Sequence, residues 1–281
     1  MRVTNLAFEM EKENRIGKYK IKPFTTYRQN IVLIVKEGWR KHSTHTLLEI
    51  DVTNAKNLIQ KYKKENKKSI SFTAWICKCV AQTMSKHKEF NSYRHGRKKY
   101  VIFDDVDIAI PVERNDENEH RPRVYILRKA NEKSVEEITD EIRSVQSEKI
   151  DESTQLLGKN LTTLEKVALN SPMFFKKILL WVTRRNAILK KRYMGTTGVT
   201  AIGMKGKFPG WVIPMGGTAT TLFVVGGITK KPGVVNDKTQ IREFLSLTLT
   251  TDHDLIDGGP LVRFVERLTG LMEDGFDLDK L

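Results

Sequence analysis

Cysteine is scarce in this chain, whose 281 residues include only Cys77 and Cys79. The two stand one residue apart within a stretch of helical apolar spacing, so we interpret them as helix residues that are at least partly buried. A zinc site would need more ligands nearby, and we expect no metal. A chain of this length buries a core large enough to fold without disulfides. The scarcity of cysteine suits a reducing compartment, so we expect a cytoplasmic protein.

Long apolar runs and low-complexity segments are also missing. The N-terminal residues lack the apolar core of a signal peptide. No run of about eighteen apolar residues exists, so the sequence predicts no transmembrane helix. No linker rich in proline, glycine or serine divides the chain. We therefore expect a polar N-terminal arm over residues 1–22 and a single α/β domain over residues 23–281.

Positive charge is in excess. Lysine and arginine total 49 against 34 acidic residues, which gives a formal net charge of +15. Such a field attracts polyanions: nucleic acid, anionic lipid, an acidic carrier protein or a phosphorylated cofactor. The lysine-rich patches lack the signatures of nucleic-acid-binding modules, so we expect no nucleic-acid partner. Many of these lysines are explained equally well as solvent-facing side chains of helices.

Two kinds of periodicity predict a chain that mixes strands with helices. Leu245, Leu247 and Leu249 alternate with polar residues, which is typical of a strand with two different faces. Ser134 and Glu137 form a capping box at the start of a helix. The other segments predicted to be regular are helices over 28–40, 54–66, 71–87, within 152–192 and from Pro260, and strands over 45–52, 100–112, 123–128, 199–202, 221–225 and 244–251. Residues 100–112 fit either a strand pair or one long bent strand.

One segment places a histidine among aspartates and glycines at the end of a predicted strand. It reads D-H-D-L-I-D-G over residues 252–258, and an amphipathic helix follows it. A histidine at a strand end can reach a cleft, and imidazole accepts protons near neutral pH. A lone histidine in a loop is more often structural, so this position alone does not make His253 catalytic.

The whole pattern, H-x-x-x-D-G before an amphipathic helix, resembles the signature of chloramphenicol acetyltransferases and of the catalytic domain of dihydrolipoamide acyltransferases. The second resemblance is closer, because that group usually carries D-H-R-V-I-D-G; here Asp254 replaces the basic residue. Other segments that resemble this domain are PFTTYRQNI (23–31), LEIDVTNAKNL, SFTAWICKCVAQTMSKHKEFNS with Asn91, VDIAIPV, TGVTAIGMKG (197–206) and TLFVVGGITKKP (221–232). The resemblance implies a chloramphenicol acetyltransferase-like two-layer α/β sandwich, with helices packed on a mixed β-sheet.

The resemblance also implies a role for each matching residue. His253 would be the general base that removes a proton from the acyl acceptor, which then attacks the thioester of coenzyme A directly. Thr200 stands where the family has a serine whose hydroxyl hydrogen-bonds the oxyanion, and threonine keeps that hydroxyl. Asp257 would be structural and pair with Arg28, so that the pair positions the histidine loop.

The family implies an assembly as well. In a homotrimer with active sites between subunits, His253 and Thr200 would come from opposite sides of an interface. Coenzyme A or its acyl ester is the expected substrate. Lys230 and Lys231 are candidates for contact with its phosphate, although a solvated turn is the better explanation of two adjacent lysines. No lipoyl domain precedes the match, so we expect no bound lipoyl group and consider a separate lipoyl protein or an acidic carrier protein as a partner.

The segment over about 161–194 departs from the family pattern. It combines apolar residues with lysines and arginines, which is typical of helices that lie on anionic membrane surfaces or dock acidic proteins. Packing on its own domain or on a neighbouring subunit explains the composition as well. Our hypothesis is that this insert reshapes the acceptor side of the site.

Three functions are compatible with the sequence. The first is an acyltransferase that moves an acyl group between coenzyme A and an acceptor thiol, hydroxyl or amine. The second is a dihydrolipoamide acyltransferase core that works with a separate lipoyl protein. The third is a non-catalytic scaffold of the same fold. The presence of His253, Thr200, Asp257 and Gly258 argues against the scaffold, which has no need of them together.

Overall fold

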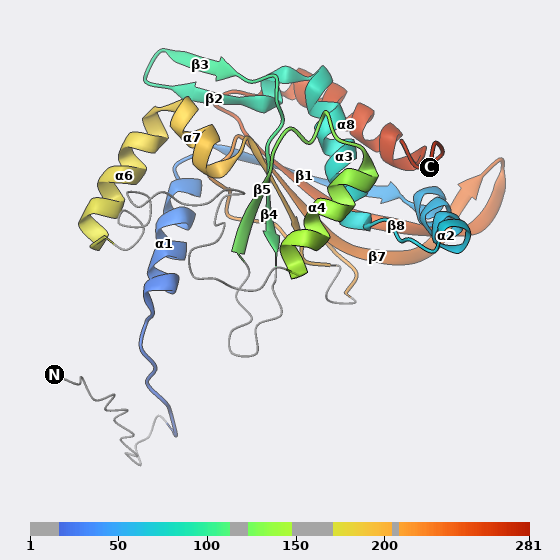
Figure 1. The fold of residues 1–281 in the computed structure, drawn as a ribbon, viewed down its shortest axis with the longest axis horizontal. Helices are drawn as coiled ribbons and strands as arrows, with labels where there is room; N and C mark the ends of the chain where they lie inside the picture. The colour runs from blue at the N-terminus through green and yellow to red at the C-terminus, as the bar shows by residue number, and fades with distance from the viewer. Residues whose placement is uncertain (1–16, 113–122, 148–170, 204–207) are drawn as a thin grey trace.

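The computed structural model describes residues 17–112, 123–147, 171–203 and 208–281 (Figure 1). Its centre is a six-stranded mixed sheet with the strand order β1-β8-β7-β6-β4-β5. β6 runs parallel to both of its neighbours, β4 and β7, and the other adjacent pairs are antiparallel. The strands are β1 (Ser43–Asp51), β4 (Ile108–Val112), β5 (Arg123–Leu127), β6 (Thr197–Ala201), β7 (Thr221–Val235) and β8 (Lys238–Asp252).

Helices cover one face of this sheet and form the hydrophobic core with it (Figure 1). They are α2 (Thr53–Asn66), α3 (Phe72–Lys86), α4 (Val135–Ser147) and α8 (Gly258–Glu273). In β8, Leu245, Leu247 and Leu249 belong to this core, as their alternation predicts. From α8, Phe264 stacks on Phe90 with ring centroids 4.0 Å apart. The predicted two-layer α/β arrangement with a mixed sheet is therefore confirmed.

Residues 100–112 form two separate strands rather than one bent strand. The first, β3 (Lys99–Ile102), pairs with β2 (Ser92–His95) in a small second sheet, and β4 belongs to the main sheet. Between them, the Asn91 side-chain amide donates to the carbonyls of Phe103 at 2.7 Å and Asp105 at 3.0 Å. Asn91 therefore fixes the turn that sends the chain from one sheet to the other. It lies in the short 3-10 helix η1 (Lys88–Asn91) after α3.

β7 and β8 extend well beyond the strands predicted for them. The two form a long hairpin arm, whose turn at Asn236 and Asp237 has left-handed backbone angles, and the arm projects from the body of the sheet (Figure 1). Side chains along the arm are largely exposed or half-buried, so no alternating pattern marks it in the sequence.

The helix predicted from Pro260 begins two residues earlier, because proline is tolerated anywhere in a first turn, where backbone N–H groups lack helical partners.

Two local predictions are confirmed by the hydrogen bonds and burial of the residues concerned. The N–H of Ser134 donates to the Glu137 carboxylate at 2.7 Å, and the N–H of Glu137 donates to the Ser134 hydroxyl at 3.1 Å, which makes a reciprocal capping box for α4. Cys77 and Cys79 are buried in α3, where burial raises the pKa of the Cys77 thiol to about 12. The two thiols are therefore core groups rather than reactive ones.

Three further helices lie at one end of the sheet: α1 (Thr26–Gly38), α6 (Met173–Arg185) and α7 (Ala187–Met194) (Figure 1). The long helix predicted within 152–192 breaks at Asn186, whose side chain accepts the first N–H groups of α7. Residues 148–170 lie outside the described part of the chain. α6 packs beside α1, because Arg184 pairs with Glu37 at 3.3 Å and Lys176 donates to the Asn30 side chain at 3.2 Å. α6 and α7 therefore form the helices in the described part of the predicted insert.

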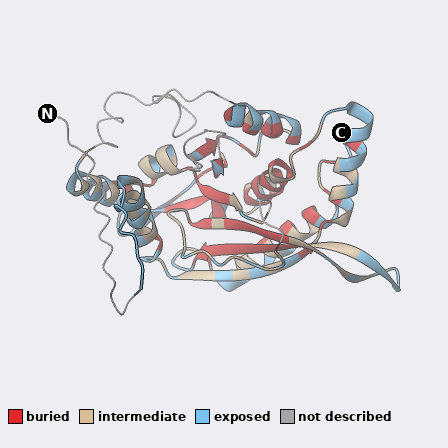
Figure 2. Cartoon of the chain, turned by 90° about the horizontal axis from the view of Figure 1, so that it is seen from below, coloured by how far each residue is buried: buried red, intermediate tan, exposed pale blue. Residues whose placement is uncertain are grey.

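α6 is amphipathic, as predicted, and most of its apolar side chains are exposed. These are Phe174, Phe175, Ile178, Leu179, Trp181 and Val182. The end of the molecule that holds α1 and α6 is mostly exposed or intermediate in burial, in contrast with the buried sheet (Figure 2). None of the described helices is both long enough and apolar enough to cross a bilayer.

Residues 17–25 precede α1 as exposed chain without helix or strand. They include the last part of the predicted arm over residues 1–22, and residues 1–16 lie outside the described part.

Candidate active site

His253 stands at the point where β8 ends. The last residue pair between β1 and β8 is Ser43 with Asp252, and the N–H of His253 then donates to the carbonyl of His42 at 2.8 Å. This bond continues the ladder by one residue and holds the backbone of His253 firmly against the neighbouring chain. The His253 side chain is exposed. An imidazole on a fixed backbone at the open end of a strand is available to a substrate.

The turn after His253 is anchored at both ends. The carbonyl of Asp252 accepts the N–H groups of Leu255 and Ile256, each at 3.1 Å. The Ile256 side chain is buried in the core and ties the turn to the helical layer. Asp257 is the N-cap residue of α8, although its carboxylate makes no capping hydrogen bond. The D-H-x-x-x-D-G pattern therefore encodes a rigid strand–turn–helix unit.

The predicted pair of Asp257 with Arg28 is not formed in the single chain. Both residues are exposed, and no ion pair joins them in the described ranges. The carboxylate that is buried beside the histidine is instead that of Asp252, which lies 3.9 Å from the ammonium of Lys41. Sequence reasoning missed Lys41, because a lysine that follows a helix has no pattern that sets it apart from solvated lysines.

Thr200 lies in the middle of the sheet, on β6. Its register partner on β7 is Val224, whose partner on β8 is Thr248. Its side chain is half-buried, and among the described residues no hydrogen bond engages its hydroxyl. The hydroxyl is therefore free to donate to a group that approaches this face of the sheet.

The register shows that one chain does not bring Thr200 and His253 together. His253 lies five positions beyond Thr248 along β8, and Thr200 lies two strands away from β8. At about 3.4 Å per residue and about 4.8 Å between strands, the two residues are roughly 19 Å apart. An oxyanion donor must lie about 3 Å from the oxygen that it stabilises. Any site that uses both side chains is therefore built from two chains.

A cavity of about 140 Å³ lies directly beside the histidine turn. Its walls include Asp252 and Asp254, the residues before and after His253 in the sequence. The rest of the wall comes from the end of α1, from α6 and α7, and from the segment before β7. Lys41 donates to the carbonyl of Thr218 at 2.9 Å and to that of Ala219. Burial and the nearby charge of Lys190 lower the pKa of Lys41 to about 7. This pocket, whose wall carries an excess of basic side chains, therefore lies next to the backbone of His253.

Lys190 of α7 is the second amine of this pocket, and the residue as a whole is half-buried. Its ammonium lies over the ring of Tyr93, 4.2 Å from the ring centroid. Burial lowers the pKa of Lys190 to about 8. Tyr93 is itself buried and donates its hydroxyl to the carbonyl of Gly195 at 2.9 Å. Sequence reasoning assigned Lys190 only to a basic helix face, so its burial is a finding of the structure.

Lys230 and Lys231 lie on the hairpin arm, away from this pocket. Lys231 pairs with Glu49 of β1, and Lys230 stands opposite Glu243 in the β7–β8 register. Each lysine thus has an acidic residue close by. Contact of either lysine with a coenzyme A phosphate stays a prediction.

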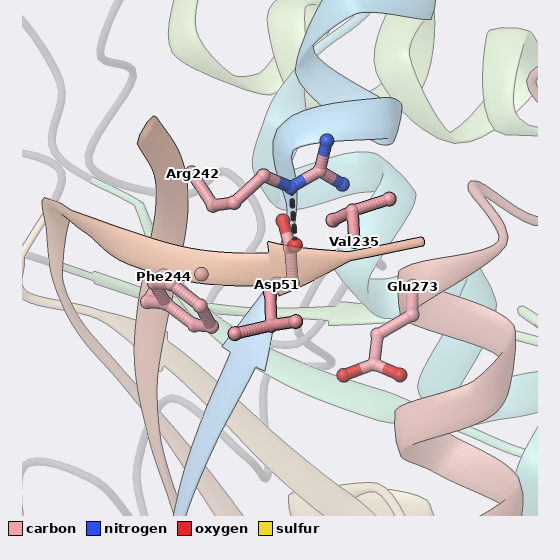
Figure 3. A pocket seen from close by; sticks show the side chains of 7 residues that line it. Asp51, Val235, Arg242, Phe244 and Glu273 are labelled. Atoms are coloured by element: carbon pink, nitrogen blue, oxygen red, sulfur yellow. Dashed lines mark hydrogen bonds and ion pairs between the residues drawn. The ribbon is translucent and has the colours of Figure 1, made fainter. Parts of the chain in front are cut away.

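A larger cavity, of about 360 Å³, lies near the hairpin arm (Figure 3). Arg242 pairs there with Asp51 at 2.6 Å, and Glu273, in the last turn of α8, lines the same cavity. α8 has 16 residues, and at about 1.5 Å per residue its two ends are roughly 24 Å apart. His253 precedes the other end of α8, so this cavity is remote from it. In the described part of the chain, no cluster of three or more His, Cys, Asp or Glu side chains is arranged to hold a metal ion.

Comparison with known proteins shows which family the chain resembles in sequence. The sequence profile of the catalytic domain of the 2-oxoacid dehydrogenases acyltransferase family matches residues 17–157 and 184–278. The chain is 23% identical, over 97% of its length, to the dihydrolipoyllysine-residue succinyltransferase component of the 2-oxoglutarate dehydrogenase complex of Buchnera aphidicola. It spans only 61% of that relative.

Solved structures share the fold of this chain. A probable dihydrolipoamide acetyltransferase from Listeria monocytogenes superposes with a TM-score of 0.66 at 20% identity, over 93% of this chain and 97% of that one. A chloramphenicol acetyltransferase superposes with a TM-score of 0.50 at 13% identity, over 88% of this chain and 95% of that one. The predicted chloramphenicol acetyltransferase-like fold is confirmed. Because the family profile covers most of its length, the chain belongs to the 2-oxoacid dehydrogenase acyltransferase family through the catalytic domain.

Proposed function

We propose that this chain is an acyltransferase that moves an acyl group between coenzyme A and an acceptor thiol, with His253 as the general base. The observation that carries the proposal is the rigid turn that presents His253 at the open end of β8, within a chain of this family. A dihydrolipoyl thiol on a lipoyl domain is the acceptor that the family match favours. Hydroxyl and amine acceptors are alternatives that the assay below separates from it.

The reaction needs one base that also acts as an acid. His253 takes the proton of the acceptor thiol, and the sulfur attacks the carbonyl carbon of the acyl thioester. A new carbon–sulfur bond forms, and the carbon–sulfur bond to coenzyme A breaks. The departing coenzyme A thiolate recovers the proton from the imidazolium. One histidine thus serves both halves of the transfer, and no acyl-enzyme is required.

The tetrahedral intermediate carries negative charge on its oxygen, and Thr200 is the proposed donor to it. Its free hydroxyl on the face of β6 supports this role, because a hydrogen bond that strengthens as charge develops lowers the barrier. One such donor contributes about 3–4 kcal/mol in comparable sites.

The roughly 19 Å between Thr200 and His253 within one chain, estimated from the strand geometry, implies a site shared by two copies. We propose a homotrimer, in which the histidine turn of one copy faces β6 of the next. Coenzyme A and the acceptor would enter this interface from opposite ends. Asp257 and Arg28 are both exposed in the single chain, so any pairing between them belongs to this assembly.

Mass spectrometry of acyl transfer from acetyl-coenzyme A tests the proposal. The acceptors are dihydrolipoamide, a carrier-protein thiol, a simple alcohol and a simple amine. Loss of a general base lowers turnover by about 100- to 10,000-fold, so His253→Ala should show that loss while keeping the wild-type circular dichroism spectrum. Formation of acylated dihydrolipoamide supports a thiol as the acceptor. Equal turnover by the wild type and His253→Ala, or no product with any acceptor, would count against catalysis and favour a scaffold.

A further inference from the structure

The small cavity beside His253 carries an excess of positive charge. Five basic side chains line it, and three carboxylates oppose them. The basic residues are Arg40, Lys41, Arg94, Arg184 and Lys190. At about 140 Å³ the cavity is smaller than the roughly 300–1,000 Å³ of pockets that hold whole drug-sized ligands. It therefore suits a single small functional group rather than an entire cofactor.

The three carboxylates are already engaged by other groups. Glu37 pairs with Arg40 at 3.4 Å and with Arg184 at 3.3 Å. Asp254 contacts His42 at 2.8 Å and Arg94 at 3.6 Å.

The remaining carboxylate, Asp252, lies 3.9 Å from Lys41. Every acidic group in the wall thus has a basic partner, and Lys190 is the cation that is left over.

The ammonium of Lys190 has no carboxylate within ion-pair distance among the described residues. Its neighbour is the face of Tyr93, which attracts a cation but does not neutralise it. A cation that is removed from water without a counter-charge is costly. An anion in the cavity would supply that counter-charge.

Part of the wall comes from a segment that the family profile does not cover. The match to the family is interrupted between residues 157 and 184. Leu180 and Thr183 of α6 fall in this interruption, and both line the cavity. The bond of Arg184 to Glu37 holds α6 in place against α1. The cavity is thus partly a product of the insert.

We propose that this cavity binds an anionic group, a carboxylate, of one of the two acyl-transfer substrates. The inference rests on the proposed function, because it assigns the cavity to the substrates of His253. The residues before and after His253 in the sequence both line the cavity. A short chain of carbon atoms can therefore join a carboxylate held by Lys190 to the reacting carbonyl. The carboxylate comes either from the far end of a dicarboxylic acyl group or from the acceptor.

Two matched substrate pairs separate these sources. The donor pair is succinyl-coenzyme A and butyryl-coenzyme A, and the acceptor pair is dihydrolipoate and dihydrolipoamide. In the wild type, kcat/KM should be higher for the charged member of one pair by about 10-fold or more, a typical effect of one charge-assisted contact. Lys190→Met should abolish that preference and leave kcat/KM for the neutral member within about twofold of the wild type.

Lys238→Met, at the exposed tip of the hairpin arm, is the matched control and should keep the wild-type preference. A lost preference in the donor pair places the carboxylate on the acyl group, and a lost preference in the acceptor pair places it on the acceptor. A preference that is equal in the wild type and Lys190→Met, in both pairs, overturns the proposal.

A second readout does not depend on turnover. Lys190 of the wild type is acylated with an amine-reactive anhydride and quantified by mass spectrometry, with and without succinate. Succinate should protect Lys190, and its neutral diamide should not. If the chain transfers no acyl group but succinate still protects Lys190, the anion site stands and the proposed function fails. If succinate gives no protection, the anion site is overturned even when acyl transfer is observed.

Discussion

At the residue scale, the chemistry of this chain is set by side chains whose neighbours are fixed by backbone hydrogen bonds. His253 was identified from its sequence pattern, because the turn that holds it is encoded locally within seven residues. Lys41 and Lys190 were not identified, because their burial depends on α1, α7 and the segment before β7 coming together. Contacts between distant segments leave no local signature in the sequence.

The two lysines Lys41 and Lys190 in the cavity wall predict how stability depends on pH. Their pKa values of about 7 and about 8 lie below the ordinary lysine value of 10.5. Above pH 7 the folded chain releases these protons while the unfolded chain still holds them. The free energy of unfolding should therefore rise with pH, by up to about 1.4 kcal/mol per pH unit for each lysine.

Urea denaturation between about pH 7 and pH 8.5, below the range in which most unfolded cysteines ionise, measures this rise. In Lys41→Met the rise should be smaller than in the wild type by about 1–2 kcal/mol over this interval. Lys238→Met, whose side chain is exposed, should keep the wild-type slope. A wild-type slope in Lys41→Met would show that the Lys41 amine is not held in its neutral form.

At the scale of secondary-structure elements, prediction succeeded where one face of an element is buried. The alternation in β8 and the apolar stripe of α8 both face the common core, so their patterns are strong. The hairpin arm has no buried face, and its length was missed. The insert was recognised as amphipathic, but its break at Asn186 depends on a side-chain cap that many asparagines do not make.

Asn91 is the side chain that holds the crossing between the two sheets. Its amide donates to the carbonyls of Phe103 and Asp105, and it is buried. Asn91→Ala leaves these carbonyls without that donor, so it should lower the free energy of unfolding by about 2–3 kcal/mol. Urea denaturation measures the loss, with Gln240→Ala on the exposed hairpin arm as a control that changes stability by less than about 0.5 kcal/mol. A loss for Asn91→Ala no larger than that of the control would contradict this role.

At the scale of the whole molecule, the fold was predictable from the sequence and the assembled site was only partly so. The family pattern predicts roles for Thr200 and His253, and the strand register separates the two residues by roughly 19 Å within one chain. The pairing of Asp257 with Arg28, which was carried over from the family, is not formed in the single chain. In the proposed assembly the partners of these residues would come from another copy of the chain, which a single sequence does not display.

The central claim is that acyl transfer takes place at a site that combines His253 of one copy with Thr200 of another. Activity of mixed oligomers tests it most directly. Thr200→Val and His253→Ala chains are co-expressed, purified as mixed assemblies by two different tags, and assayed with acetyl-coenzyme A and dihydrolipoamide. Each variant alone should be at least about 100-fold slower than the wild type.

Every trimer that contains both variants pairs an intact Thr200 with an intact His253 at about one third of its shared sites. The mixed assemblies should therefore recover about one third of the wild-type rate. Mixed assemblies that are no faster than the two variants alone would contradict a site shared between copies.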